Sequence, residues 1–169
     1  MNERSFSRAA AALLLLGALD SCGYSLARGA PLPGGGKSLA VAPFTNQTAF
    51  ADVGGLFAGA MRDALAAHGR LAVEGDSSAA SLQGDLRALH DYPSALGATG
   101  ASAFHLAADV RLRIVGADGL LYEDNASAGE DYLQGIDVLG TEANRRTALR
   151  RLADKLVREA LERMELAGR

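Results

Sequence analysis

The sequence of 169 residues has little of several residue types, and each shortage excludes a class of protein. It has one cysteine, Cys22, so no intramolecular disulfide can form. None of its three histidines has metal-ligand spacing to another histidine, a cysteine or an acidic cluster. No apolar run reaches the roughly 20 residues that a transmembrane helix needs. A net charge of −3 lacks the basic excess typical of proteins that bind nucleic acid.

Catalytic motifs are also missing. The segment 100–104 resembles the G-x-S-x-G motif of serine hydrolases but lacks its second glycine. Two acidic pairs, at 123–124 and 130–131, fall in an expected strand, where neighbouring side chains point to opposite faces. Neither pair can therefore form a carboxylate dyad by itself. We expect a protein that is not an enzyme and that holds neither a cofactor nor a metal.

The N-terminus has the features of a bacterial secretory signal. Arg4 and Arg8 precede an apolar run over residues 9–18, which is too short to cross a bilayer. Leu19 lies three positions before Cys22, as in the lipobox of bacterial lipoproteins, although the acidic Asp20 is unusual there. We predict that residues 1–21 are a cleaved signal peptide and that Cys22 carries a lipid bearing palmitate. The alternative is an ordinary cleaved signal followed by an unmodified cysteine.

The rest of the chain divides into a tether and one domain. Residues 22–37 are rich in glycine and proline, which predicts a flexible tether after the lipidated cysteine. Its end, Gly36-Lys37-Ser38, is not a phosphate-binding loop, because Pro31 stands where that motif needs glycine and a strand follows. Residues 38–169 are long enough for a single domain with its own core.

The first half of this domain is expected to contain two short strands around a helix. Residues 38–44 predict an apolar strand that ends at a proline. Phe57, Met61 and Leu65 recur with helical spacing, which predicts a helix over 53–68 with Asp52 as its N-cap. Residues 71–73 predict a second short strand.

The second half predicts antiparallel strands followed by a long helix. Alternating patterns predict strands over 82–91, ended by Pro93, and over 108–114, with a loop over 94–102. A hairpin turn at 117–119 leads into a strand over 120–127, extending toward Tyr132 beyond a break at Gly129. Residues 141–164 predict an amphipathic helix. The order predicts an α+β fold, a two-layer sandwich in which two helices cover a mostly antiparallel sheet.

Two segments resemble the lipopolysaccharide-assembly lipoprotein family, LptE. They are the Cys22-Gly23-Tyr24 start and the strand and turn LAVAPFTNQT over 39–48. The order of elements that follows extends the resemblance over nearly the whole chain. It implies a lipoprotein anchored in the outer membrane on its periplasmic side, a plug and assembly partner of the LptD-type β-barrel, and a protein that binds lipopolysaccharide and helps it reach the outer leaflet.

The residues that bind such an anionic glycolipid are inferred from their spacing alone. Arg111 and Arg113 lie two positions apart on the clearest strand, so both project from one face. Arg87, one strand earlier, and Lys37, near the anchor, are the other candidate cations. The alternative is that the arginines simply keep one face of the sheet hydrated.

A second function remains open at this point. Activators of cell-wall synthases and curli-secretion lipoproteins also begin with a strand and turn similar to residues 41–48, so the chain could regulate or scaffold another envelope machine. Those families alternate strands and helices after this segment. The consecutive strands expected here favour lipopolysaccharide assembly.

Overall fold

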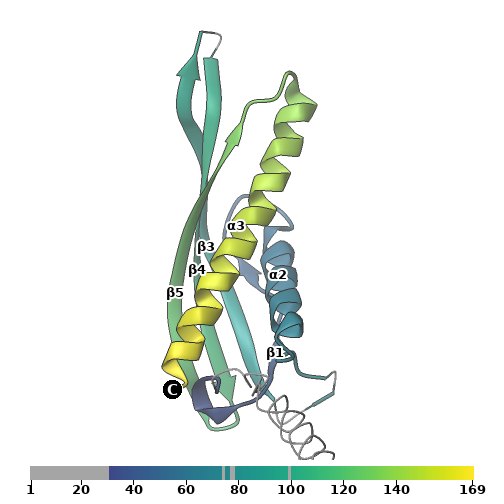
Figure 1. Ribbon diagram of the computed structural model, residues 1–169, viewed down its shortest axis with the longest axis vertical. Coiled ribbons are helices and arrows are strands. Elements are labelled where there is room, and N and C mark those ends of the chain that lie inside the picture. The colour runs from purple at the N-terminus through teal and green to yellow at the C-terminus, as the bar shows by residue number, and fades with distance from the viewer. Residues whose placement is uncertain (1–30, 74, 77–78, 99) are drawn as a thin grey trace, which may run out of the picture.

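The computed structural model describes residues 31–73, 75–76, 79–98 and 100–169 (Figure 1). The predicted signal peptide, Cys22 and the tether up to residue 30 lie outside the described residues, so those expectations stay predictions. None of the described helices is long and apolar enough to cross a membrane.

The fold is a two-layer α+β sandwich, as predicted from the sequence. Five strands form one sheet: β1 (Leu39–Val41), β2 (Thr45–Asn46), β3 (Ala80–Gly97), β4 (Gly100–Gly116) and β5 (Gly119–Leu133). The order is β1-β3-β4-β5, with β2 beside β3. β1 and β2 run parallel to β3, while β3, β4 and β5 form an antiparallel meander. The helices α2 (Val53–Ala67) and α3 (Val138–Ala167) lie on the same face of this sheet (Figure 1).

The core forms between the helices and one face of the meander. Val110, Leu112 and Ile114 on β4 are buried, while the alternate residues Arg111 and Arg113 face the other way, as the period of a strand requires. The apolar stripes of both helices cover these strands. The buried helix residues include Phe57, Met61 and Leu65 of α2 and Leu152, Leu156, Ala160 and Met164 of α3.

Strand β3 continues past Pro93, so the strand end predicted there and the loop over 94–102 are wrong. Pro93 pairs with Phe104 of β4, and the two strands run on to Gly97 and Gly100. A proline in a strand lacks only its N–H. On its other edge β3 pairs with β1 and β2 only through residues 80–82 and 85–86, so the edge at Pro93 has no neighbouring strand that would need this donor.

A β-bulge in β3 determines which way the side chain of Leu89 points. The register between β3 and β4 shifts between Leu86 and Ala88, which inserts Arg87 as an extra residue. Beyond the bulge, residues change faces. Leu89 therefore points into the core and is 7% exposed, whereas simple alternation places it outside.

Three other local expectations differ from the structure. Asp52 precedes α2, but it has φ of 61° and its side chain makes no capping hydrogen bond. Residues 71–73 form no strand, and only Leu71 makes an isolated bridge, to Leu39. Strand β5 passes through Gly129 without a break and reaches Leu133.

Part of the expected tether packs against the domain. A short 3₁₀ turn spans Pro33–Gly35, and the preceding Leu32 is 1% exposed within the main core. The amide of Gly35 donates to the carbonyl of Leu32, at 2.9 Å, which closes the turn. Among the described residues, packing against the core therefore begins at Leu32.

Candidate functional site

The face of the sheet opposite the helices carries the arginines selected from the sequence. Both helices lie on one side of the meander, so neither covers this outer face (Figure 1). The register of β3, β4 and β5 places Gln83, Arg113 and Glu123 in one row across the strands. The next row contains Asp85, Arg111 and Asn125. The arginines therefore project from a rigid surface of paired strands.

Glu123 pairs with Arg111 and is close enough to Arg113 and Arg87 to respond to their charges. Arg111 Nη2 lies 2.5 Å from Glu123 Oε1. This hydrogen bond is the largest cause that lowers the pKa of Glu123, and the charges of Arg111, Arg113 and Arg87 lower it further. The structure therefore brings Arg87, Arg111 and Arg113 into one electrostatic cluster, which we call the outer-face arginine cluster.

Asp85 forms the anionic side of the same cluster. Its carboxylate accepts hydrogen bonds from Thr45 Oγ1 at 2.6 Å and from Gln47 Nε2 at 3.0 Å. Arg87 Nε is 3.9 Å from Asp85 Oδ2, a long contact for an ion pair. The side chains of Thr45 in β2 and of Gln47 just after β2 therefore fix the carboxylate, while Arg87 is held only loosely.

The cluster has N–H donors that no described residue of the protein accepts. Arg113 makes no ion pair or side-chain hydrogen bond that the structure describes, and Arg87 is close to one carboxylate oxygen only. A guanidinium offers five N–H donors in a planar fork that matches phosphate and carboxylate geometry. The surface can therefore bind an anionic group without breaking the pair of Arg111 and Glu123.

Lys37, the fourth candidate cation, is not part of this cluster. It is exposed and lines a separate hollow of about 430 Å³ with Asp118 of the β4–β5 turn and Leu121 of β5. It is not among the charges that act on Glu123. The structure therefore does not join Lys37 to the three arginines.

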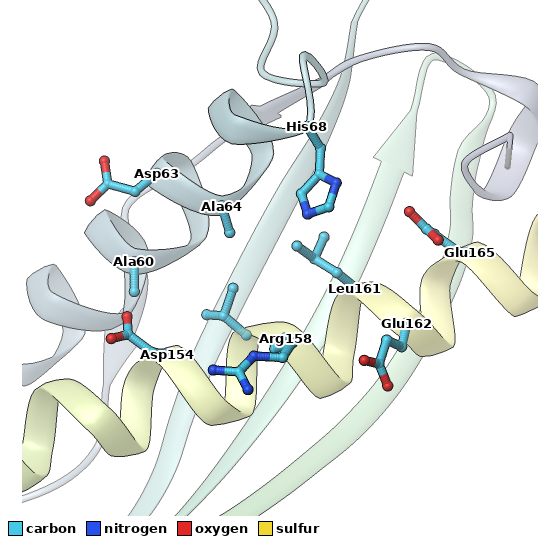
Figure 2. A pocket seen from close by; sticks show the side chains of 10 residues that line it. Ala60, Asp63, Ala64, His68, Asp154, Arg158, Leu161, Glu162 and Glu165 are labelled. Carbon is cyan, nitrogen blue, oxygen red and sulfur yellow. The ribbon is translucent and has the colours of Figure 1, made fainter. Parts of the chain in front are cut away.

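The groove between α2 and α3 is a second candidate surface, of about 350 Å³ (Figure 2). Its floor is apolar, with Ala60 and Ala64 of α2 facing Leu161 of α3. Four carboxylates and two basic side chains surround this floor: Asp63, Asp154, Glu162, Glu165, His68 and Arg158. These carboxylates do not gather into a metal-binding group, and no cluster of three or more metal-ligating side chains occurs among the described residues.

A third hollow lies at the start of α2, and nothing in the sequence analysis predicted it. It has a volume of about 510 Å³, and its lining includes Phe50, Arg145, Arg146 and Arg150. The guanidinium of Arg145 lies 4.7 Å from the centre of the Phe50 ring, a cation–π contact. The sequence did not identify Arg145 as a candidate site residue, because the residues that it contacts are distant in sequence. Helical spacing alone shows only that it lies on the helix.

Comparison with known families identifies the chain. The family described as LptE, lipopolysaccharide-assembly, matches residues 36–164, which is most of the sequence. The chain belongs to the LptE family. This match places it in lipopolysaccharide assembly, within a family of envelope lipoproteins that are not enzymes. No curated protein matches the chain.

Solved structures share the fold of this LptE family member. A putative lipoprotein from Caulobacter crescentus superposes with a TM-score of 0.54 at 18% identity, covering 75% of this chain and 92% of that one. Rare lipoprotein B from Shewanella oneidensis superposes with a TM-score of 0.52 at 13% identity, covering 74% of this chain and 92% of that one. A single-residue variant of the PelC dodecamer from Paraburkholderia phytofirmans superposes with a TM-score of 0.52 at 21% identity, covering 83% of this chain and 95% of that one. At these identities the likeness shows the fold alone.

Proposed function

We propose that this LptE family member is an outer-membrane lipoprotein, anchored through Cys22 on the periplasmic side, that binds lipopolysaccharide. In this role it assists assembly of an LptD-type β-barrel and the passage of lipopolysaccharide to the outer leaflet. The observation that carries the binding proposal is the outer-face arginine cluster on a sheet face that no described helix covers.

The chemistry of lipopolysaccharide suits this surface. Its phosphates are anions that guanidinium groups bind through paired N–H donors. Arg113 makes no ion pair or side-chain hydrogen bond with any described residue, and Arg87 is held by one long contact. Arg111 is positioned by Glu123, so the N–H groups that it does not donate to Glu123 are held at a fixed place on the sheet. A rigid surface reduces the ordering that binding requires.

The test exchanges the two arginines of β4. We expect Arg111→Ser with Arg113→Ser to lower lipopolysaccharide capture in a pull-down by about tenfold or more, since each lost charge-assisted hydrogen bond is worth about 1.5–3 kcal/mol. Arg158→Ser is the matched control, because Arg158 lies in the groove between the helices. Unchanged capture by the double variant would remove both arginines from the site and leave hydration of the sheet as their role.

The anchor is tested separately. Cys22→Ala should release the protein from the outer-membrane fraction into the soluble periplasm, because the substitution removes the thiol that carries the proposed lipid. If this variant still fractionates with the membrane, the lipid is not what holds the protein there. The barrel would then be the attachment.

The alternative role is to regulate or scaffold another envelope machine, such as a cell-wall synthase. Such lipoproteins alternate strands and helices after their first strand and turn. Here β3, β4 and β5 follow one another without an intervening helix. This meander, together with the family match, favours lipopolysaccharide assembly.

A further inference from the structure

The hollow at the start of α2 brings together three guanidinium groups from one stretch of α3. It lies in the helix layer, on the other side of the sheet from the outer-face arginine cluster (Figure 1). Its volume of about 510 Å³ is in the range of small-molecule sites. Arg145, Arg146 and Arg150 line it, beside apolar side chains that include Phe50 and Leu149. We call this site the arginine hollow.

Arg145 forms the fixed wall of the arginine hollow. Its Nε donates to Asp91 at 2.7 Å and its Nη1 donates to Glu142 at 3.3 Å. The Phe50 ring packs against the same guanidinium. Its Nη2 is buried, and no described residue accepts a hydrogen bond from it. A buried donor without an acceptor is unfavourable, and the hollow that Arg145 lines is where an acceptor can enter.

Arg146 and Arg150 form the open side of the hollow. They lie one helical turn apart on α3, a spacing that places their Cβ atoms about 5–6 Å apart, and like charges at this spacing destabilise a helix. Arg146 is 70% exposed and donates through Nε to Glu142 at 3.0 Å, and no described residue accepts from its terminal nitrogens. Arg150 is exposed and makes no ion pair or side-chain hydrogen bond that the structure describes. An anion between the two would relieve their repulsion.

A phosphate group suits this pair of arginines better than a carboxylate does. A carboxylate has two oxygens, and a single guanidinium fork already engages both of them. A phosphate on a larger group has three terminal oxygens and close to two negative charges. It can therefore accept hydrogen bonds from two guanidinium forks at once. The apolar part of the wall favours a phosphate that is carried on such a larger group.

We propose that the arginine hollow binds a phosphate group, with Arg146 and Arg150 as its main donors and Arg145 as a fixed third donor. The expected source is the phosphorylated headgroup of lipopolysaccharide, and this part of the proposal rests on the proposed function. Inorganic phosphate is the other source of the same group. The hollow and the outer-face arginine cluster lie on opposite sides of the sheet, so the hollow is a second site.

Binding at the hollow should be weaker than at the outer-face arginine cluster. Asp52 and Glu142 also line the hollow, and Arg145 already donates to Asp91 and Glu142. Arg150 is then the one arginine of this hollow that has no described partner. The outer-face arginine cluster therefore remains the main contributor to lipopolysaccharide capture.

Photochemical cross-linking of the full-length chain in living cells tests for lipopolysaccharide in the hollow. Ala49 is exposed and lines the hollow, so it is replaced by the photoreactive residue p-benzoylphenylalanine. We expect an adduct that antibodies to lipopolysaccharide detect, and at least tenfold less of it when Arg146→Ser and Arg150→Ser are added. Ala67, an exposed alanine at the end of α2 and outside the hollow, is the matched control position and should give little adduct.

A second control separates binding by these two arginines from a general loss of positive charge. Arg158→Ser with Arg169→Ser removes the same number of charges from exposed positions outside the hollow. We expect this pair of substitutions to leave the adduct at position 49 unchanged. Urea denaturation checks that each variant is folded.

Calorimetric titration tests the other source of phosphate. The full-length protein, purified in an uncharged detergent, is titrated with inorganic phosphate and with glucose 1-phosphate. Arg111→Ser and Arg113→Ser are present throughout, so that the outer-face arginine cluster does not contribute. Adding Arg146→Ser and Arg150→Ser should weaken binding of both ligands by at least tenfold.

Dependence on Arg146 and Arg150 decides the outcome. The proposal holds if their replacement lowers the adduct, the phosphate affinity or both by at least tenfold. Loss of the adduct identifies lipopolysaccharide as the source, whereas an effect on phosphate affinity alone identifies inorganic phosphate. The proposal is overturned if neither quantity falls. The proposed function fails on a different result, unchanged capture by the variant of Arg111 and Arg113, so the two failures are distinguishable.

Discussion

The Arg145 side chain of α3 lies with its Nε 2.7 Å from Oδ2 of Asp91 on β3, an ion pair between residues 54 positions apart. Asp91 also accepts a hydrogen bond from the Tyr132 hydroxyl at 3.0 Å. Both partners of the ion pair are mostly buried, with side chains 19% and 16% exposed. This contact joins the N-terminal part of α3 to the part of β3 beyond its pairing with β1 and β2.

We expect Arg145→Ala to lower the free energy of unfolding by about 2–3 kcal/mol, because it leaves Asp91 charged and mostly buried without its cation. Urea denaturation followed by circular dichroism measures this loss. Arg146→Ala is the control: Arg146 is 70% exposed and pairs only with Glu142 among the described residues, so it should change stability by less than about 0.5 kcal/mol. Equal effects of the two substitutions would show that the pair with Asp91 does not hold α3 in place.

Ionisation of Tyr132 should lower the stability of the fold at alkaline pH. Burial, followed by the hydrogen bond and negative charge of Asp91, raises the pKa of Tyr132 from 10.0 to about 12. In the unfolded chain the phenol ionises near pH 10, whereas in the folded chain it stays neutral until about pH 12. The stabilisation from this raised pKa is therefore complete below pH 10 and declines as the pH rises through about 12, by about 2 kcal/mol in total.

The prediction is tested by comparing chains with and without this hydroxyl. Between pH 10 and 12, the unsubstituted protein should lose more stability than Tyr132→Phe, as measured by urea denaturation at each pH. Tyr92→Phe, at a tyrosine that is 49% exposed, should follow the unsubstituted profile. Parallel profiles for Tyr132→Phe and the unsubstituted chain would contradict the account of Tyr132.

Gly84 in β3 is required because the Phe44 ring packs on it. A Cβ at position 84 would lie 2.3 Å from two ring carbons, and Phe44 is itself buried. We expect Gly84→Ala to destabilise the fold by about 1–3 kcal/mol. Gly59→Ala is the matched control within α2: its Cβ would meet nothing within 4 Å, so it should stabilise the helix by about 0.5–1 kcal/mol. Thermal unfolding should show a lower midpoint for Gly84→Ala and a higher one for Gly59→Ala. An unchanged midpoint for Gly84→Ala would contradict the packing of Phe44 on Gly84.

Local sequence patterns predicted the structure correctly where each face of a strand or helix has the same surroundings along its whole length. Val110, Leu112 and Ile114 alternate with Arg111 and Arg113 because β4 has a core on one face and solvent on the other, and that pattern predicts both the core and the two central arginines. The apolar stripe of α3 is predictable for the same reason, since one continuous face lies on the sheet.

Sequence patterns did not predict the structure where contacts between distant segments determine the local conformation. Pro93 stays within β3 because that edge has no described partner strand, which no local pattern reveals. The bulge at Arg87 turns Leu89 inward, since the register with β4 shifts there. Helical spacing places Glu159 one turn before Arg163, but the described ion pairs of Arg163 and Arg151 are with Asp124 and Glu130 of β5. Helix α3 lies along β5, so strand carboxylates compete with helical neighbours.

The most direct test of the proposed function is to identify the outer-membrane protein that copurifies with the tagged full-length lipoprotein. After mild detergent extraction and affinity capture, mass spectrometry should find a large LptD-type β-barrel as the main partner. It should still be present when Arg111 and Arg113 are replaced by serine, because those residues are assigned to lipopolysaccharide and not to the barrel. Recovery of a peptidoglycan synthase in place of the barrel would contradict the account.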